Sequence, residues 1–271
     1  MKIAFLGGGN MARALIGGLL AKGYAAADLS VIEPVPAARD ALAASHGVHV
    51  SAAPDAATFA ADTLVLAVKP QDMRAALAPL AGRLSTQLVV SIAAGIRLAD
   101  LSRWLGGHAR LVRVMPNTPA LIGQGVAGLY APAAVGAEER ARAERILGAV
   151  GATVWVEDEA LIDPVTAVSG SGPAYVFYFI EAMEKAGVEL GLAPQAARTL
   201  AIQTFVGAAR LAAESADPPA VLRERVTSKG GTTEAALKVF AEEDLGERVQ
   251  RALDAASRRG AELGDLLGKD G

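Results

Sequence analysis

Short apolar runs alternate with amphipathic segments through the first 160 residues. The runs lie at 2–7, 29–34, 48–51, 63–70, 87–95 and 109–116, and the segments between them include 72–84 and 98–105. Strands that are apolar almost throughout are typical of a parallel sheet with both faces covered, and the segments between them have the pattern of crossover helices. This alternation predicts an α/β protein with a Rossmann-like, doubly wound parallel sheet.

Two more strands are predicted at 123–131 and 151–158, on either side of a helix at 137–149. From Glu159 onward the hydrophobic pattern has only the period of a helix. We therefore expect a dinucleotide-binding domain at 1–160 and an all-helical domain at 161–271.

The helical half carries much aliphatic surface. The segment 173–192 is apolar nearly all round, which is typical of a buried helix, whereas 194–215 and 244–264 are long and amphipathic. About 110 residues of such helix are hard to stabilise alone, so we expect burial against a second copy in an obligate homo-oligomer.

Composition and charge narrow the class of protein. The chain is 52% hydrophobic, but no run reaches the roughly 18–20 apolar residues of a membrane span. The apolar run at 3–6 is too short for a signal peptide, and Asn10 and Arg13 interrupt the segment after it. Without cysteine there is neither a disulfide framework nor thiolate chemistry, and a cytoplasmic enzyme is expected. The net charge of −3 argues against a nucleic-acid partner.

A glycine motif comes after the first predicted strand. The pattern G-x-G-x-x-A is made by Gly7, Gly8, Gly9, Asn10, Met11 and Ala12, and helical spacing of apolar residues begins at Met11. In this setting Gly7 permits the tight turn, Gly9 lets the backbone approach a pyrophosphate, and Ala12 permits close packing of helix on strand. The motif predicts an NAD(P)-type cofactor. Glu33, at the end of the next strand, suits the ribose hydroxyls of NAD, whereas Arg39 suits the 2′-phosphate of NADP. It is equally consistent with the sequence that Glu33 is only a solvated surface charge after a strand.

Two other strand ends carry polar side chains. Lys69 and Pro70 follow one strand, and the Lys69 ammonium suits a phosphate, a nicotinamide amide or a substrate carboxylate. Asn117 and Thr118 follow another, between two prolines that stiffen the loop. Ligands of such sheets bind beyond the carboxyl ends of the strands, so these residues are candidates for the site.

Two predicted helix starts offer hydroxyl groups. Ser169 and Ser171 precede Pro173, and Thr232 and Thr233 follow a glycine pair in "TSKGGTTEAAL". Hydroxyls, exposed amides and a helix N-terminus together suit a small carboxylate, although a simple N-cap needs only one of the hydroxyls.

The three histidines lie outside every motif, and no cluster has the spacing of metal ligands, so no metal is expected. Reduction of a carbonyl usually needs an acid or base such as histidine, whereas an imine nitrogen can arrive protonated. The available side chains therefore favour reduction of an imine over reduction of a carbonyl.

With these residues in place, the chain resembles pyrroline-5-carboxylate reductase. The matching segments are "FLGGGNMA", "LAVKPQ", "RVMPNTPA", "LIDPVTAVSGSGPAY" and "VTSKGGTTEAAL", in the family's order over most of the chain. The last two are specific to that family, whereas the first is shared by many dehydrogenases.

The resemblance implies reduction of 1-pyrroline-5-carboxylate to L-proline with NADPH or NADH, the last step of proline biosynthesis. It implies a Rossmann-like domain and a helical dimerisation domain, whose homodimers often assemble further into decamers. The cofactor would be held by residues 7–12, Glu33, Asn117 and, beside the nicotinamide, Ala67, Val68, Lys69 and Pro70. The substrate would be held by Ser171, Ser228, Gly230, Gly231, Thr232 and Thr233, with Thr233 at the ring nitrogen and Thr233 and Lys69 as the catalytic pair.

Two residues depart from the family pattern. Lys229 stands where proline is common, and Pro54 stands where many members have asparagine near the adenosine.

Two other functions remain open. A β-hydroxyacid dehydrogenase would carry a catalytic lysine in the helix from Pro173, but the first lysine there is Lys185, three turns along. A dinucleotide-binding sensor would keep the glycine motif but would have little use for the hydroxyl-rich segments.

Overall fold

The computed structural model describes residues 1–269 and shows two compact units. One consists of residues 1–171 together with the chain from residue 254, and the other of residues 172–253. The predicted division lay after residue 160. The first unit thus keeps eleven more residues and also includes the C-terminal part of the last helix.

The first unit is built on one eight-stranded sheet of order β3-β2-β1-β4-β5-β6-β7-β8. The strands are β1 (Ile3–Leu6), β2 (Leu29–Ile32), β3 (His49–Ser51), β4 (Thr63–Leu66), β5 (Leu88–Ser91), β6 (Leu111–Met115), β7 (Gly125–Tyr130) and β8 (Gly151–Trp155). All eight coincide with predicted runs, which confirms the Rossmann-like fold. The sheet is not wholly parallel, because β7 pairs with β6 in the antiparallel sense and β8 lies parallel to β7. The nine residues between β6 and β7 are too few for a crossover connection, which needs a dozen or more.

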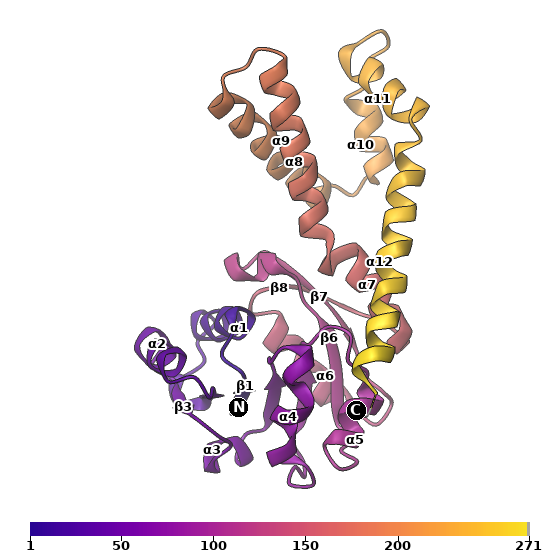
Figure 1. Cartoon of the computed structure of the whole chain (residues 1–271). Coiled ribbons are helices and arrows are strands. Elements are labelled where there is room, and N and C mark those ends of the chain that lie inside the picture. Colours follow the sequence, from indigo (N-terminus) through magenta and orange to yellow (C-terminus); the bar gives the residue numbers. More distant parts are fainter. Residues whose placement is uncertain (270–271) are drawn as a thin grey trace. The chain divides into compact units, whose positions relative to one another are not determined.

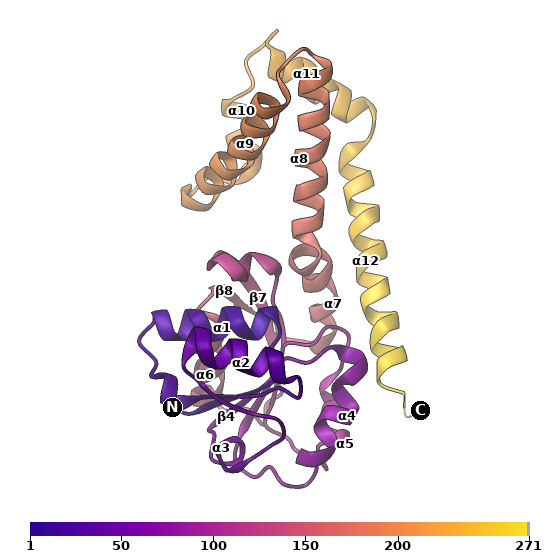
Figure 2. The same cartoon turned by 60° about the vertical axis from the view of Figure 1, so that its left-hand side comes forward.

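Helices cover both faces of this sheet (Figures 1 and 2). On one face Phe5 and Val31 pack with α1 (Asn10–Ala21), α2 (Pro36–His46) and α6 (Ala137–Leu147). On the other face Leu6 and Leu64 pack with α4 (Met73–Leu77) and α5 (Leu98–Trp104). The side chains of each strand point alternately to the two faces, so a strand covered on both, such as β1, must be apolar throughout. That requirement produces the continuous apolar runs of the sequence.

Two shorter helices complete this unit, α3 (Ala56–Phe59) and α7 (Ile162–Val165), and the last helix, α12 (Leu245–Leu267), joins it from Asp254 onward. Arg97 ties α12 to the sheet-bearing unit. It forms an ion pair of 2.7 Å with Asp265 and donates a hydrogen bond of 3.3 Å to the carbonyl of Ala261.

The second unit contains α8 (Gly172–Glu189), α9 (Pro194–Glu214), α10 (Pro219–Arg225) and α11 (Thr232–Glu242). Helices α8 and α9 pack against each other. In the single chain α8 has no buried residue, and Phe177 and Tyr178 are 65% and 69% exposed, so the burial predicted for 173–192 would have to come from a second copy. The apolar pattern was read correctly, but one chain does not supply enough neighbours to cover every side of α8. Among residues 1–269, no helix is long and apolar enough to cross a bilayer.

Candidate dinucleotide and substrate sites

The turn between β1 and α1 needs glycine at its first position. Gly7 has φ +98°, and a Cβ there would lie 2.8 Å from the carbonyl oxygen of Ala67. A side chain would therefore be strained by its backbone and would also overlap the end of β4. The Gly7 amide donates to the Ile32 carbonyl at 2.9 Å, so the turn is tied to β2 as well.

Gly9 is the N-cap of α1 and makes no side-chain cap. Its φ of −69° suits any residue, and a Cβ there would meet no atom within 4 Å. The free space beside Gly9 lies where the first-turn amides of α1 leave the helix without intrahelical acceptors. An open helix N-terminus with this backbone is a site for an anion such as a pyrophosphate.

A cleft of about 560 Å³ opens beside this turn, at the carboxyl ends of β1, β2 and β4. Its lining consists of Leu6, Gly7, Gly8, Gly9, Ile32, Glu33, Pro34, Val35, Ala52, Ala53, Pro54, Ala67, Val68, Lys69, Asp72, Ala76 and Pro79. The structure thus brings together seven of the predicted cofactor residues: the three glycines, Glu33, Ala67, Val68 and Lys69. Pro54, the departure from the family pattern, also lines the cleft.

The other predicted cofactor residues lie outside this lining. Ala12 is fully buried and packs in the core, and Met11 is partly buried against it. Asn10 is exposed at the start of α1, and Pro70 begins a 3-10 turn (Pro70–Asp72) after Lys69.

Glu33 is held by two backbone amides. Its Oε2 accepts a hydrogen bond of 3.0 Å from Gly8 and its Oε1 accepts one of 3.0 Å from Val35. Arg39 faces backbone oxygens instead, because its Nη1 donates to the carbonyls of Glu33 and Pro34 at 2.8 Å each. The carboxylate is therefore fixed at the mouth of the cleft.

Lys69 follows the end of β4 by three residues and lines the cleft. Within residues 1–269 no carboxylate forms an ion pair with its ammonium. The cleft therefore contains a cation that is available to a ligand.

Asn117 bridges two backbone segments. Its Nδ2 donates to the Ser169 carbonyl at 3.2 Å, and its Oδ1 accepts from the Val126 amide at 2.9 Å. The side chain is 9% exposed, so this structure uses it to join β7 to the segment around Ser169.

The segment before Pro173 holds the predicted helix start, which follows directly on a π turn. Residues Thr166–Gly170 form a π turn that continues α7, and α8 begins at Gly172. The Ser171 amide donates to the Thr166 carbonyl at 2.8 Å, and the Ser169 hydroxyl donates to the Val165 carbonyl at 2.9 Å. The predicted helix start is thus present at Gly172, with Pro173 in its first turn, while the Ser171 amide before it is already hydrogen-bonded. Ser171 itself is half-buried at the end of this turn.

The second predicted helix start is present. The hydroxyl loop, residues 226–233, leads into α11, whose N-cap is Gly231 with no side-chain cap. Gly230 has φ +73°, its amide donates to the Glu234 carboxylate at 2.6 Å, and the Gly231 amide donates to the Ser228 carbonyl at 3.0 Å. A Cβ on Gly231 would lie 2.5 Å from the Ser228 hydroxyl, so glycine lets this hydroxyl lie against the start of α11.

The hydroxyl loop therefore gathers five of the six predicted substrate residues at one helix N-terminus: Ser228, Gly230, Gly231, Thr232 and Thr233. Lys229 is exposed in the same loop. Ser171, the sixth residue, belongs to the other unit.

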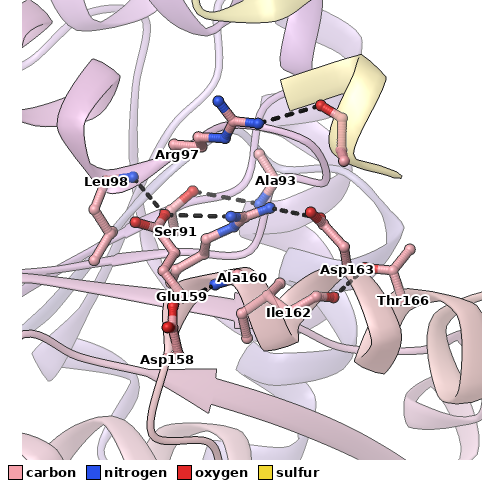
Figure 3. Close-up of polar contacts among 12 residues, drawn as sticks. Ser91, Ala93, Arg97, Leu98, Asp158, Glu159, Ala160, Ile162, Asp163 and Thr166 are labelled. Atoms are coloured by element: carbon pink, nitrogen blue, oxygen red, sulfur yellow. Dashed lines mark hydrogen bonds and ion pairs between the residues drawn. The ribbon is translucent and has the colours of Figure 1, made fainter. Parts of the chain in front are cut away.

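A buried arginine that sequence reasoning did not single out lies in the middle of β6. Arg113 is 3% exposed and contacts Glu159 at 3.2 Å and Asp163 at 3.5 Å. Glu159 also accepts the Leu98 amide at 2.8 Å, and Figure 3 shows Glu159 and Asp163 facing the same space. An arginine inside an otherwise apolar strand was the signal, since a buried charge needs partners. The network joins the sheet to the chain that leads into α7.

Asp55 caps α3 next to Pro54. Its Oδ1 accepts the amides of Ala57 and Thr58, and its Oδ2 lies 2.6 Å from His49 Nε2. Burial raises the pKa of this carboxyl, but the hydrogen bonds from His49 and Thr58 and the charge of His49 outweigh burial and leave the pKa below its ordinary value. Among residues 1–269, no three His, Cys, Asp or Glu side chains gather as a metal site.

The comparisons with known proteins cover both parts of the chain. Residues 159–263 match the model described as pyrroline-5-carboxylate reductase dimerisation, and residues 2–95 match the model described as NADP oxidoreductase, coenzyme F420-dependent. A pyrroline-5-carboxylate reductase of Pseudomonas aeruginosa is 50% identical over 99% of this chain and 98% of its own length. One from Haemophilus influenzae is 44% identical over 98% of each chain.

Solved structures agree. A pyrroline-5-carboxylate reductase of Coxiella burnetii superposes with a TM-score of 0.93 at 41% identity, over 97% of this chain and 98% of that one. The Plasmodium falciparum enzyme, solved with NADP bound, gives 0.85 at 28% identity over the same shares. With relatives of this identity along its whole length, the chain belongs to the pyrroline-5-carboxylate reductase family.

Proposed function

We propose that this chain reduces the C=N bond of 1-pyrroline-5-carboxylate to L-proline with NADPH or NADH, the last step of proline biosynthesis. The observation that carries the proposal is the full-length match to curated reductases of this name, in a chain that keeps both the glycine turn and the hydroxyl loop. Membership of the family supports the reaction, and the two sites contain the residues proposed to perform it.

The cofactor lies in the cleft of the sheet-bearing unit in this proposal. When bound, NAD(P)H supplies a hydride from its nicotinamide ring. The amides of residues 9–12 would hold the pyrophosphate, Glu33 would hold the adenosine ribose, and residues 67–70 would hold the nicotinamide. Asn117 contributes to the cofactor site indirectly, by joining β7 to the segment around Ser169, since backbone groups already occupy its side-chain amide.

The substrate is held at its carboxylate by the hydroxyl loop. Ser228 and Thr232 offer hydroxyls, Gly230 and Gly231 let the backbone come close, and the N-terminus of α11 favours a negative charge. One exposed helix terminus contributes only about 0.3–1 kcal/mol, so the hydroxyls supply the specificity. Ser171, in the sheet-bearing unit, is the sixth residue proposed to bind the substrate.

The chemistry needs one hydride and one proton. The hydride forms a new C–H bond at the imine carbon, the π electrons of the C=N bond move to nitrogen, and a proton on that nitrogen completes the amine. Thr233 hydrogen-bonds the ring nitrogen and guides its protonation, and the free ammonium of Lys69 serves as the cation beside the reacting centre. None of the residues in either proposed site is a histidine.

The proposal includes a homodimer that buries the exposed apolar residues of α8, and further assembly of dimers into a decamer. The match to a dimerisation model over 159–263 supports the dimer. The absence of cysteine and the metabolic role support a cytoplasmic enzyme.

The first test is NADH and NADPH oxidation by the purified protein, with and without 1-pyrroline-5-carboxylate. Imine-dependent oxidation is expected. Tight cofactor binding without it would favour a dinucleotide sensor instead.

The second test is Thr233→Ala. We expect turnover to fall at least about 100-fold, as for a positioned proton-transfer group, while NAD(P)H affinity stays nearly unchanged because the residue lies in the other unit. Thr199→Ala is the matched control, since its hydroxyl only donates to the Gln195 carbonyl on α9. Normal turnover in Thr233→Ala would remove Thr233 from the catalytic pair.

A further inference from the structure

We propose that the cleft selects NADH over NADPH, and that the fixed carboxylate of Glu33 makes the selection. This deepens the proposed function, because it concerns the cofactor of the same site. The relevant observation is the way in which Glu33 is held.

The Glu33 carboxylate cannot turn away from the cleft without losing two hydrogen bonds. The Gly8 amide holds one oxygen and the Val35 amide holds the other, each at 3.0 Å. Gly8 belongs to the glycine turn and Val35 is the N-cap of α2, so the carboxylate joins the two backbone segments at this mouth of the cleft. A glutamate held in this way keeps one position.

That position suits a ribose with both hydroxyls free. A carboxylate has about four acceptor sites, and the two amides use two of them. The other two remain for the 2′- and 3′-hydroxyls of the adenosine ribose, which lies at the end of the second strand in this fold.

The same position opposes a 2′-phosphate. A phosphate monoester carries between one and two negative charges near pH 7, and it would have to lie against the carboxylate. The cleft lining has two carboxylates, Glu33 and Asp72, and one cation, Lys69. The charged side chains that line the cleft therefore carry a net negative charge, and the one nearest the expected ribose is the fixed Glu33 carboxylate.

The two arginines nearby are committed to backbone oxygens. Arg39 donates to the carbonyls of Glu33 and Pro34 at 2.8 Å each, and Arg13 donates to the carbonyls of Gly8 and Ala38 at 3.0 and 3.3 Å. Their present contacts hold the backbone that carries Glu33.

The test is calorimetric binding of NAD⁺ and NADP⁺ to the full-length protein, without imine. We expect NAD⁺ to bind at least about 10-fold more tightly, a difference of ~1.4 kcal/mol. In Glu33→Gln the ratio should shift toward NADP⁺ by about 10-fold, because the charge is lost while one acceptor oxygen is kept. Arg39→Ala should leave the preference for NAD⁺ in place.

Asp72→Asn is the matched control, since it removes one negative charge from the same lining without touching Glu33. If the ratio of NAD⁺ to NADP⁺ affinity shifted equally in Asp72→Asn, the total charge of the cleft would select the cofactor, and the role of Glu33 would be overturned. Equal or tighter binding of NADP⁺ by the unmodified protein would overturn the selection itself, and this result does not depend on any variant folding. Selective binding of NAD⁺ without imine-dependent turnover would refute the reductase and leave the selection standing.

Discussion

Gly9→Ala separates the binding role of the glycine turn from its structural role. The backbone at Gly9 is extended, with φ −69° and ψ −177°, and a new Cβ would meet no atom of the protein within 4 Å. The folded chain therefore accommodates alanine without strain. A glycine-to-alanine change at such a position stabilises a protein by about 0.4–1 kcal/mol, through the smaller entropy of the unfolded chain.

The cost of Gly9→Ala falls on the cofactor. The space that the methyl group fills is the space beside the first-turn amides of α1, where the proposed pyrophosphate approaches the backbone. We expect NADH and NADPH to bind at least about 10-fold more weakly, a loss of ~1.4 kcal/mol. Gly7→Ala should behave differently, because its φ of +98° and the 2.8 Å approach to the Ala67 carbonyl would damage the fold as well.

The assay compares two quantities for the same protein. Thermal unfolding reports stability, and quenching of protein fluorescence reports NADH affinity. Gly17→Ala is the control, since it lies in α1 outside the cleft lining and its Cβ would make only an ordinary contact of 3.8 Å with His46. Unchanged NADH affinity in Gly9→Ala would refute the placement of the pyrophosphate at this helix N-terminus.

Two further predictions concern stability. Arg113→Met should lower the free energy of unfolding by about 2–3 kcal/mol. Removing one partner of a fully buried ion pair costs ~3–5 kcal/mol, but Glu159 and Asp163 are partly exposed, so the loss is smaller. An unchanged midpoint of unfolding in urea, at fixed protein concentration, would contradict this. Asp55→Ala should cost about 0.5–2 kcal/mol through loss of the α3 cap, whereas Asp55→Asn, which still caps, should lose only the His49 contact. Because the folded pKa of Asp55 lies below its ordinary value of 3.8, the stabilisation is complete above that value and is lost as the pH falls through the folded pKa. The difference in melting temperature between the original protein and Asp55→Ala should therefore shrink in strongly acidic solution, and a gap that widens there would contradict the pKa direction.

The elements that sequence reasoning predicted well are those that neighbouring residues decide. Each buried strand needs apolar residues on both faces, and the turn after β1 needs glycine at position 7, so both features are visible in short stretches of sequence. The start of α11 at Thr232 was likewise predicted from the adjacent glycine pair and hydroxyls.

The features that depend on partners far along the chain were not predictable in this way. The antiparallel direction of β7 results from the shortness of the connection before it, and the Ser171 amide is taken up by a π turn that continues α7. Arg113 meets Glu159 and Asp163 across about 50 residues of chain, which no local pattern shows.

Glu33 shows most clearly what the sequence alone determines and what only the tertiary structure decides. An acidic residue after the second strand is visible in the sequence, and it left NAD, NADP and a solvated surface charge equally open. Val35, two residues along the chain, holds one of its oxygens, but only the fold brings Gly8 to the other, and this turns a mobile side chain into a fixed charge at the cleft. A side chain's chemical type is local, whereas its position depends on backbone groups that folding brings to it.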